Sequence, residues 1–140
     1  MKNITFEKYQ GNGNDFIVID SRGNDLYKNY KSNKFFDIKH ICNRQFGIGA
    51  DGVIFVEEPN KDNYARMIIF NSDSSEAQMC GNGIRCLVEY LHVNDAQKNK
   101  NNEYKIETKA GLKIAKYIKD EITVKMGFPI LDSQYIPTKI

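Results

Sequence analysis

The sequence predicts an α+β fold in which a curved, largely antiparallel sheet wraps around one central helix. Three observations lead to that class. Short segments rich in β-branched and aromatic residues recur along the chain, only two stretches show helical periodicity, and no regular strand–helix–strand alternation is present. The length of 140 residues, with 41% hydrophobic and 27% charged side chains, fits one core-forming domain.

Strands are expected wherever such a segment is bounded by Gly, Asn, Asp or Pro. In chain order they are Ile4–Tyr9, Phe16–Asp20, Val53–Glu57, Met67–Asn71, Tyr104–Thr108, Leu112–Ile118 and Ile122–Met126. A short helix is expected in Phe35–Phe46, where apolar residues recur at helical spacing ahead of Gly47. A clearer helix is expected from Gly81 to about Val93. Its apolar stripe, spaced i, i+3, i+4, i+7, consists of Ile84, Leu87, Val88 and Leu91.

Two stretches lack periodicity. The polar tract from Asn94 to Asn102 predicts a solvated, mobile loop without a catalytic role. After Met126, Gly127-Phe-Pro129 ends the last strand, and the tail to Ile140 resembles the start of a connection to something further on.

The charge balance and cysteine content exclude several classes of protein. A net charge of +2 from 20 basic and 18 acidic residues, without a polybasic face, argues against nucleic acid or a membrane surface as partner. No apolar run suits a signal peptide or a membrane span, so a soluble, cytoplasmic protein is expected. Three cysteines are an odd number, which argues against a disulfide framework and leaves at least one thiol free.

Two motifs that could suggest a dinucleotide or a metal site are weak evidence for either. Gly47–Gly52 matches G-x-G-x-x-G, but a helix precedes it and a strand follows, the reverse of a dinucleotide site. It therefore predicts a tight helix-to-strand turn with positive φ. Potential metal ligands lack the paired spacing of structural zinc modules, so no metal is expected and the histidines are assigned to helix surfaces. These ligands are His40, Cys42, Cys80, Cys86 and His92.

The most informative segment is Phe70–Arg85, which joins a strand to the clearer helix and places Cys80 at the helix start. Amides and the helix dipole at such a position favour the thiolate, so the thiol can act as a base. Gly81 and Gly83 leave room for an anion such as a carboxylate beside the sulfur. Taken alone, a cysteine there is more often a small buried residue, and both interpretations stay open.

Neighbouring amides and the other cysteines limit how such a site could work. The Asn/Gly turn Gly11–Asp15 and Asn71 could face the same pocket, although asparagine is more often simply a turn residue. Cys86 follows Cys80 by six residues, about 9 Å along the helix and roughly 120° around it, so the two cannot flank one carbon atom. Cys42 is expected in the core.

Four spaced motifs resemble those of the diaminopimelate epimerases, cofactor-independent enzymes that interconvert LL- and meso-diaminopimelate. The motifs are Gly11–Phe16, Arg44–Asp51, Phe70–Asp73 and Met79–Arg85, and the resemblance covers nearly the whole chain. It implies a two-lobed protein in which each lobe, a sheet around a helix, supplies one catalytic cysteine.

By this resemblance Cys80 is the acid/base of the first lobe. Gly81 and Asn82 bind the carboxylate of the reacting centre, Asn14 and Asn71 contact the substrate, and neither a cofactor nor a metal is needed. The chain departs from the family pattern at Asn12, usually apolar, and at Ser74, usually glycine.

The resemblance also sets the expected domain division and the alternatives. Residues 1–126 would be the N-terminal lobe, 127–140 the start of a connection to a second lobe, and the chain alone would be inactive or nearly so. Three alternatives remain: two copies pairing as a homodimer, a binding lobe that docks with a separately encoded second lobe, or a related racemase for another amino acid.

Overall fold

A computed structural model describes residues 3–33, 35–95 and 99–136. Its strands are β1 Glu7–Gly11, β2 Asn14–Asp20, β3 Gly52–Glu57, β4 Ala65–Asn71, β5 Glu76–Ala77, β6 Glu103–Thr108, β7 Gly111–Ile118 and β8 Glu121–Lys125. Its helices are α1 Leu26–Asn33, α2 Ile38–Cys42 and α3 Gly81–Asp95, with a short 3₁₀ turn at Ser133–Tyr135.

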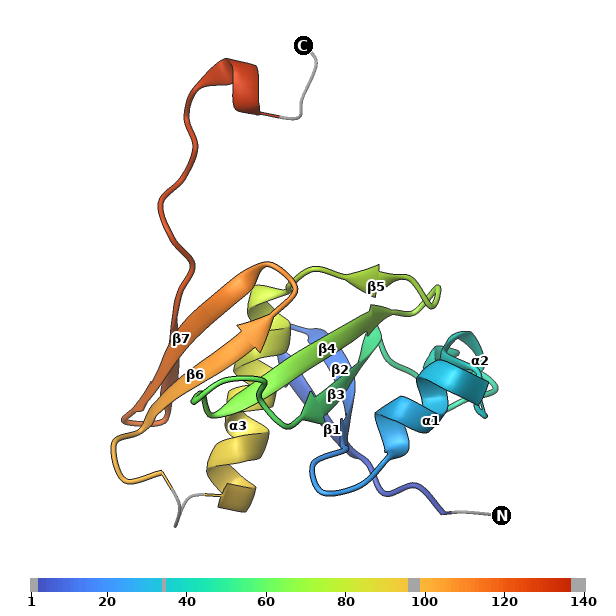
Figure 1. Cartoon of the computed structure of the whole chain (residues 1–140). Helices are drawn as coiled ribbons and strands as arrows, with labels where there is room; N and C mark the ends of the chain where they lie inside the picture. The colour runs from blue at the N-terminus through green and yellow to red at the C-terminus, as the bar shows by residue number, and fades with distance from the viewer. Residues whose placement is uncertain (1–2, 34, 96–98, 137–140) are drawn as a thin grey trace.

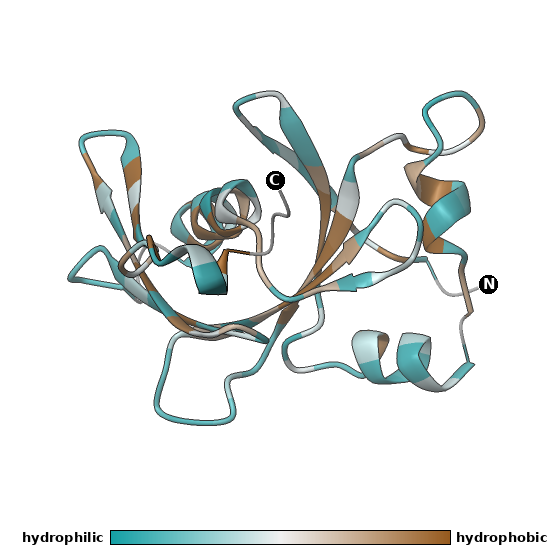
Figure 2. Ribbon diagram, turned by 90° about the horizontal axis from the view of Figure 1, so that it is seen from above, coloured by the Kyte–Doolittle hydropathy of each residue, from teal (hydrophilic) through white to brown (hydrophobic). Residues whose placement is uncertain are grey.

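The strands form one mixed sheet in the order β1-β2-β3-β4-β6-β7-β8, with β5 paired to β4. Two pairings, β2 with β3 and β4 with β6, are parallel, and the other pairings are antiparallel. The sheet curls into a half-barrel around α3, while α1 and α2 lie on its outer side (Figures 1 and 2). The predicted α+β class, with a curved, mostly antiparallel sheet wrapped around a central helix, is confirmed.

A separate apolar cluster covers each face of the sheet. On the inner face, the predicted stripe of α3 is fully buried against strands from both halves of the sheet. On the outer face, Tyr30 of α1 stacks on Phe55 with ring centroids 5.4 Å apart, and Ile38 of α2 is buried beside them. Because β3 is covered on both faces, Val53–Val56 are all buried.

The structure adds one helix to the expected elements and moves the bounds of the other two. Helix α1 was not predicted, and α2 is only Ile38–Cys42 rather than most of Phe35–Phe46. The tract expected to be a solvated loop is partly ordered, because Asn94 and Asp95 continue α3. Asp95 is buried and pairs with Arg22, which explains why this polar residue extends the helix. Residues 96–98 of that tract lie outside the described residues.

The end of the described chain leaves the sheet after β8 as an extended segment (Figure 1). Its apolar side chains are exposed, with Phe128 at 97% and Leu131 at 80% of their full accessible surface. Within the described residues, no helix combines the length and the apolar character needed to cross a membrane.

Candidate active site

Cys80 occupies the N-cap of α3, as its sequence position predicts. Its carbonyl oxygen accepts from the Ile84 N–H at 2.9 Å, and its sulfur accepts from the Gly83 N–H at 3.3 Å. The sulfur thus takes the place of the oxygen atom of a Ser or Asp cap. The residue is half-buried and packs against the inner apolar cluster.

Two asparagines from distant motifs lie beside this sulfur. Asn14 Oδ1 is 3.7 Å from Cys80 Sγ and also accepts from Asn82 Nδ2 at 3.4 Å. Asn82 Oδ1 in turn accepts from Asn12 Nδ2 and Arg85 Nη1, each at 3.1 Å. The β1–β2 turn and the first turn of α3 therefore form one hydrogen-bonded surface around Cys80.

Gly81 and Asn71 occupy different positions relative to this surface. Gly81 is the first residue of α3, and the nearest atom to a side chain built there would be Met126 Cε at 3.7 Å. Asn71 ends β4, and its amide donates to Ser75 Oγ at 2.9 Å within the next turn. Within the described chain no hydrogen bond joins Asn71 to Cys80, Asn14 or Asn82, so its predicted substrate contact rests on the resemblance alone.

The other two cysteines have structural environments. Cys86 and Cys42 are both buried, each within one of the two apolar clusters. Burial raises the pKa of the Cys86 thiol to about 12 and that of the Cys42 thiol to about 11, so both stay protonated near neutral pH. Of the three cysteines, only Cys80 is partly exposed.

A charged cluster behind Asn14 was not predicted from the sequence. Asn14 Nδ2 donates to Asp51 Oδ2 at 2.9 Å, and the Arg44 guanidinium contacts Asp51 at 3.0 Å and Asp15 at 2.7 Å. Hydrogen bonds from Arg44 hold the pKa of the Asp15 carboxyl well below its usual range, and those from Asn14 lower the pKa of Asp51. Arg44 and Asp51 both belong to the Arg44–Asp51 motif, but no feature of the sequence indicated that they contact Asn14 and Asp15.

The two departures from the family pattern both fall at left-handed backbone positions. Asn12 has φ of 56° and Ser74 has φ of 72°. Asparagine tolerates this conformation, whereas serine does so with strain. The usual glycine at the position of Ser74 therefore has a conformational explanation.

The Gly47–Gly52 segment is a helix-to-strand turn, as predicted. Gly49 has φ of 82°, the positive value expected for the turn. The other two glycines are needed for close approach: a side chain at Gly47 would lie 2.1 Å from the His40 carbonyl oxygen, and one at Gly52 2.4 Å from that of Phe70. Among the described residues, no three His, Cys, Asp or Glu side chains gather as potential metal ligands.

The histidines differ from each other in environment. His40 is exposed on α2, as predicted for a helix-surface residue. His92 is only partly exposed, because its ring stacks on Tyr117 at 3.7 Å and bonds the Tyr104 hydroxyl at 3.0 Å. Neither lies in the surface around Cys80.

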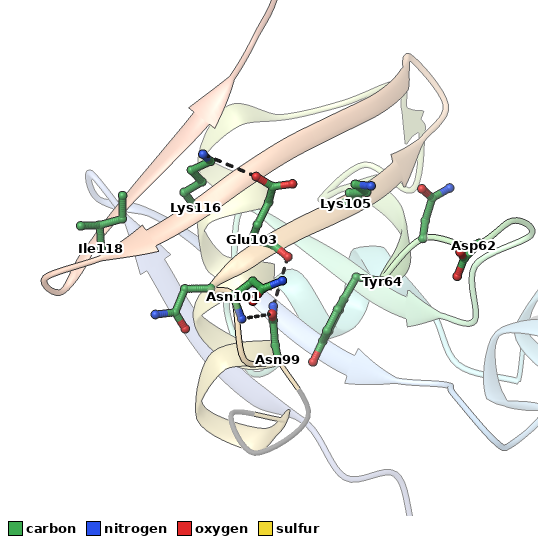
Figure 3. A pocket seen from close by; sticks show the side chains of 10 residues that line it. Asp62, Tyr64, Asn99, Asn101, Glu103, Lys105, Lys116 and Ile118 are labelled. Atoms are coloured by element: carbon green, nitrogen blue, oxygen red, sulfur yellow. Dashed lines mark hydrogen bonds and ion pairs between the residues drawn. The ribbon is translucent and has the colours of Figure 1, made fainter.

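A polar depression of about 470 Å³ lies away from Cys80, lined by β6, β7, the segment after α3 and residues 62–64 (Figure 3). Its charged and polar groups bond to one another: Lys116 pairs with Glu103 at 3.5 Å, and Asn99 donates to the Glu103 carbonyl oxygen at 3.2 Å. No cysteine lines this depression, so the partly exposed Cys80 and its asparagines are the stronger candidate site for acid/base chemistry.

Comparisons with known proteins agree with the motifs. The chain is similar to the diaminopimelate epimerase of Prochlorococcus marinus (strain NATL2A), 54% identical over 100% of this chain and 49% of that protein. The diaminopimelate epimerase of Methanocella arvoryzae is 47% identical, over 98% of this chain and 48% of the relative. The chain thus spans about half the length of the curated relatives it matches.

Two solved structures are similar to this chain in fold. A hydroxyproline epimerase from Agrobacterium vitis, with bound trans-4-hydroxy-L-proline, matches with a TM-score of 0.61 and 16% identity, over 85% of this chain and 40% of that one. A PhzF-family protein of Bacillus anthracis matches with a TM-score of 0.58 and 22% identity, over 83% and 36%. The sequence profile described as "Diaminopimelate epimerase" matches residues 6–131, so this chain belongs to the diaminopimelate epimerase family.

Proposed function

We propose that this chain is the N-terminal lobe of a diaminopimelate epimerase, with Cys80 as one of two catalytic acid/base residues. The complete enzyme would interconvert LL- and meso-diaminopimelate without a cofactor. Its product would be used in the synthesis of lysine and of peptidoglycan precursors. The observation that carries the proposal is a partly exposed cysteine at the N-cap of α3, with its sulfur 3.3 Å from the Gly83 amide nitrogen.

The chemistry needed is inversion at an α-carbon. A thiolate on one face removes the proton: the C–H bond breaks, an S–H bond forms, and the electron pair stays on the carbon atom. A thiol on the opposite face then donates its own proton to that pair. In one direction Cys80 is the base, and its negative charge is stabilised by the Gly83 N–H and the helix dipole.

The reacting carboxylate would lie at the same helix end. The amides of Gly81 and Asn82 are among the first N–H groups of α3, which have no partner inside the helix. They could donate to the carboxylate and stabilise the charge that builds on it as the proton leaves. Asn14 would line the same surface, since its side chain already contacts both Cys80 and Asn82.

The second thiol must come from outside the described chain. Cys86 and Cys42 are buried, and burial keeps both protonated and away from any substrate at Cys80. The half of the relatives that this chain does not span is the proposed source of the second cysteine. The 140-residue chain alone is therefore expected to be inactive or nearly so.

The test is exchange of the α-proton of diaminopimelate in deuterated water, measured by mass spectrometry on the complete two-lobed protein and on the 140-residue chain. Cys80→Ala should abolish exchange in the complete protein, and the buried cysteines provide matched controls, since Cys86→Ala and Cys42→Ala should retain it. Near-normal exchange by Cys80→Ala would refute its catalytic assignment.

Two of the alternatives predict different outcomes. Robust turnover by the chain, combined with a dimeric mass from light scattering, would instead support pairing of two copies. Preferential turnover of another amino acid by the complete protein would favour a related racemase.

A further inference from the structure

We propose that Asp51 is a positioning residue for Cys80: its carboxylate orients the Asn14 side chain so that oxygen Oδ1, rather than the NH₂ group, faces the sulfur. The catalytic meaning of this role rests on the proposed function, whereas the hydrogen-bond geometry does not. The oxygen and nitrogen ends of an asparagine side chain have the same shape and opposite hydrogen-bonding character, so its orientation must be set by its neighbours.

Asp51 removes that ambiguity because an ionised carboxylate can only accept. Its Oδ2 receives the Asn14 Nδ2 group at 2.9 Å and the Asp15 backbone N–H at 3.0 Å. With its nitrogen committed to Asp51, Asn14 presents Oδ1 to Cys80 Sγ at 3.7 Å. Asn82 supports the same orientation by donating to Oδ1 from its other side at 3.4 Å.

Asp51 is itself held in place on both of its oxygens. Arg44 Nη2 donates to Oδ1 at 3.0 Å, and the backbone N–H of Asp51 donates to the Asp15 carbonyl oxygen at 2.9 Å. Its carbonyl oxygen accepts the Ser72 N–H at 3.1 Å. The carboxylate is thus fixed relative to the starts of β2 and β3, and hydrogen bonds to it keep its pKa low, so that it remains an acceptor at neutral pH.

The consequence for Cys80 is that each of its protonation states has a partner. As a thiol it can donate its S–H to Asn14 Oδ1, and as a thiolate it accepts the Gly83 N–H. A residue that must act as acid in one direction and base in the other needs both states to be accessible. If Asn14 presented Nδ2 instead, two donors would face the sulfur and the thiol state would be disfavoured.

The variant Asp51→Asn should reverse the Asn14 orientation. Arg44 favours the oxygen of the new amide on its side, which turns the NH₂ group toward Asn14 and leaves the Asp15 N–H without its acceptor. Asn14 can accept that NH₂ group only by turning its own oxygen away from Cys80. Its Nδ2 then faces the sulfur, where it favours the thiolate.

The measurement is the pH profile of Cys80 alkylation by iodoacetamide in the folded 140-residue chain, followed on the Cys80 peptide by mass spectrometry. The midpoint should fall by roughly 0.5–1 pH unit in Asp51→Asn. In an Asn14→Ala background the same substitution should produce no comparable fall. Asp120→Asn, which removes an exposed carboxylate in the β7–β8 turn at a φ that asparagine tolerates, is the control for general charge.

An unchanged midpoint in Asp51→Asn would overturn the proposal, and so would an equal fall in the Asn14→Ala background, because Asp51 would then act by charge alone. Should Asp51→Asn not fold, Asn14→Ala tests the S–H bond without which Asp51 has no orientation to impose. Infrared spectroscopy should show the Cys80 S–H stretch moving to higher frequency when its acceptor is removed, and no movement would refute the S–H bond. Neither readout depends on epimerase activity, so failure here is distinguishable from failure of the proposed function.

Discussion

Gly52 directly follows Asp51 of the candidate site and begins β3. Replacing one of its Cα hydrogen atoms by a methyl group, as in Gly52→Ala, is expected to destabilise the fold. Gly52 pairs with Phe16 of β2 and Asn71 of β4. A Cβ atom there would lie 2.4 Å from the Phe70 carbonyl oxygen and 3.2 Å from the Phe16 ring. The first distance is about 1 Å short of the 3.4 Å at which ordinary contact begins.

Because the nearest atom belongs to the backbone, the clash cannot be relieved by turning a side chain. The strands must separate locally, which weakens one or two ladder hydrogen bonds at about 1 kcal/mol each. Displacing the packed Phe16 ring adds about 1–3 kcal/mol. Gly52→Ala should therefore lose roughly 3 kcal/mol, which lowers Tm by about 10 °C for a chain of this length.

Thermal unfolding followed by circular dichroism measures this loss, and Gly81→Ala is the matched control. A Cβ atom at Gly81 meets nothing closer than Met126 Cε at 3.7 Å, an ordinary contact. That variant should melt within about 2 °C of the unmodified chain. If Gly52→Ala melted as high as Gly81→Ala, the close approach of β3 and β4 would not be what requires glycine at this position.

Three further outcomes are expected. Ser74→Gly should raise Tm by about 2–4 °C, because relief of about 1–2 kcal/mol of left-handed strain exceeds the extra entropy of glycine in the unfolded chain; a lower Tm would contradict this. Since hydrogen bonds lower the pKa of Asp15 on folding, it stabilises the chain above about pH 4 and this contribution is lost as pH falls through the lowered value. Asp15→Asn should accordingly show a shallower loss of stability in acid urea titrations, and an unchanged slope would argue against the pairing. Finally, Cys86 and Cys42 should be alkylated at least about 10-fold more slowly than the N-cap cysteine at pH 8, because burial restricts access and raises their pKa values; equal rates on peptide mapping would show that they are accessible.

Helix α3 could be predicted almost to its ends because its information is local. Its apolar stripe repeats at helical spacing, and the observed helix Gly81–Asp95 differs from the expected one only at its C-terminal end. That extension depends on Asp95, whose partner Arg22 lies 73 residues earlier in the sequence. A polar residue that is buried by so distant a partner carries no local signal.

Helix α1 shows the opposite situation. Leu26–Asn33 is a polar octapeptide in which Tyr30 is the one buried residue. Its ring packs on Phe36, Phe55 and Phe70, with centroids 5.0–5.4 Å apart, and these rings come from three other segments. The helix is thus stabilised mainly by tertiary packing, which propensity and periodicity do not report.

In the candidate site, too, some features could be predicted from local sequence and others could not. Cys80 could be placed at a helix start from the sequence, because the glycines and the periodic stripe that follow it are neighbours in the chain. The contact of Asn14 with Asp51 could not, since 37 positions separate them. For Asn71, whose amide bonds to Ser75, the substrate contact stays a prediction.

The sequence did not indicate the parallel pairing of β2 with β3, and it is this pairing that assembles the site. Because these strands run in the same direction, they begin at the same end of the sheet, which brings Asn14 beside Asp51. Strand β4 runs back antiparallel and ends there, and α3 begins beside the β1–β2 turn, so Cys80 reaches the same place. Had β3 followed β2 as an antiparallel neighbour, Asp51 would lie at the far end of the sheet and could not reach Asn14. Asn/Gly turns that look unremarkable one by one therefore become a site through strand direction, a property that no single motif encodes.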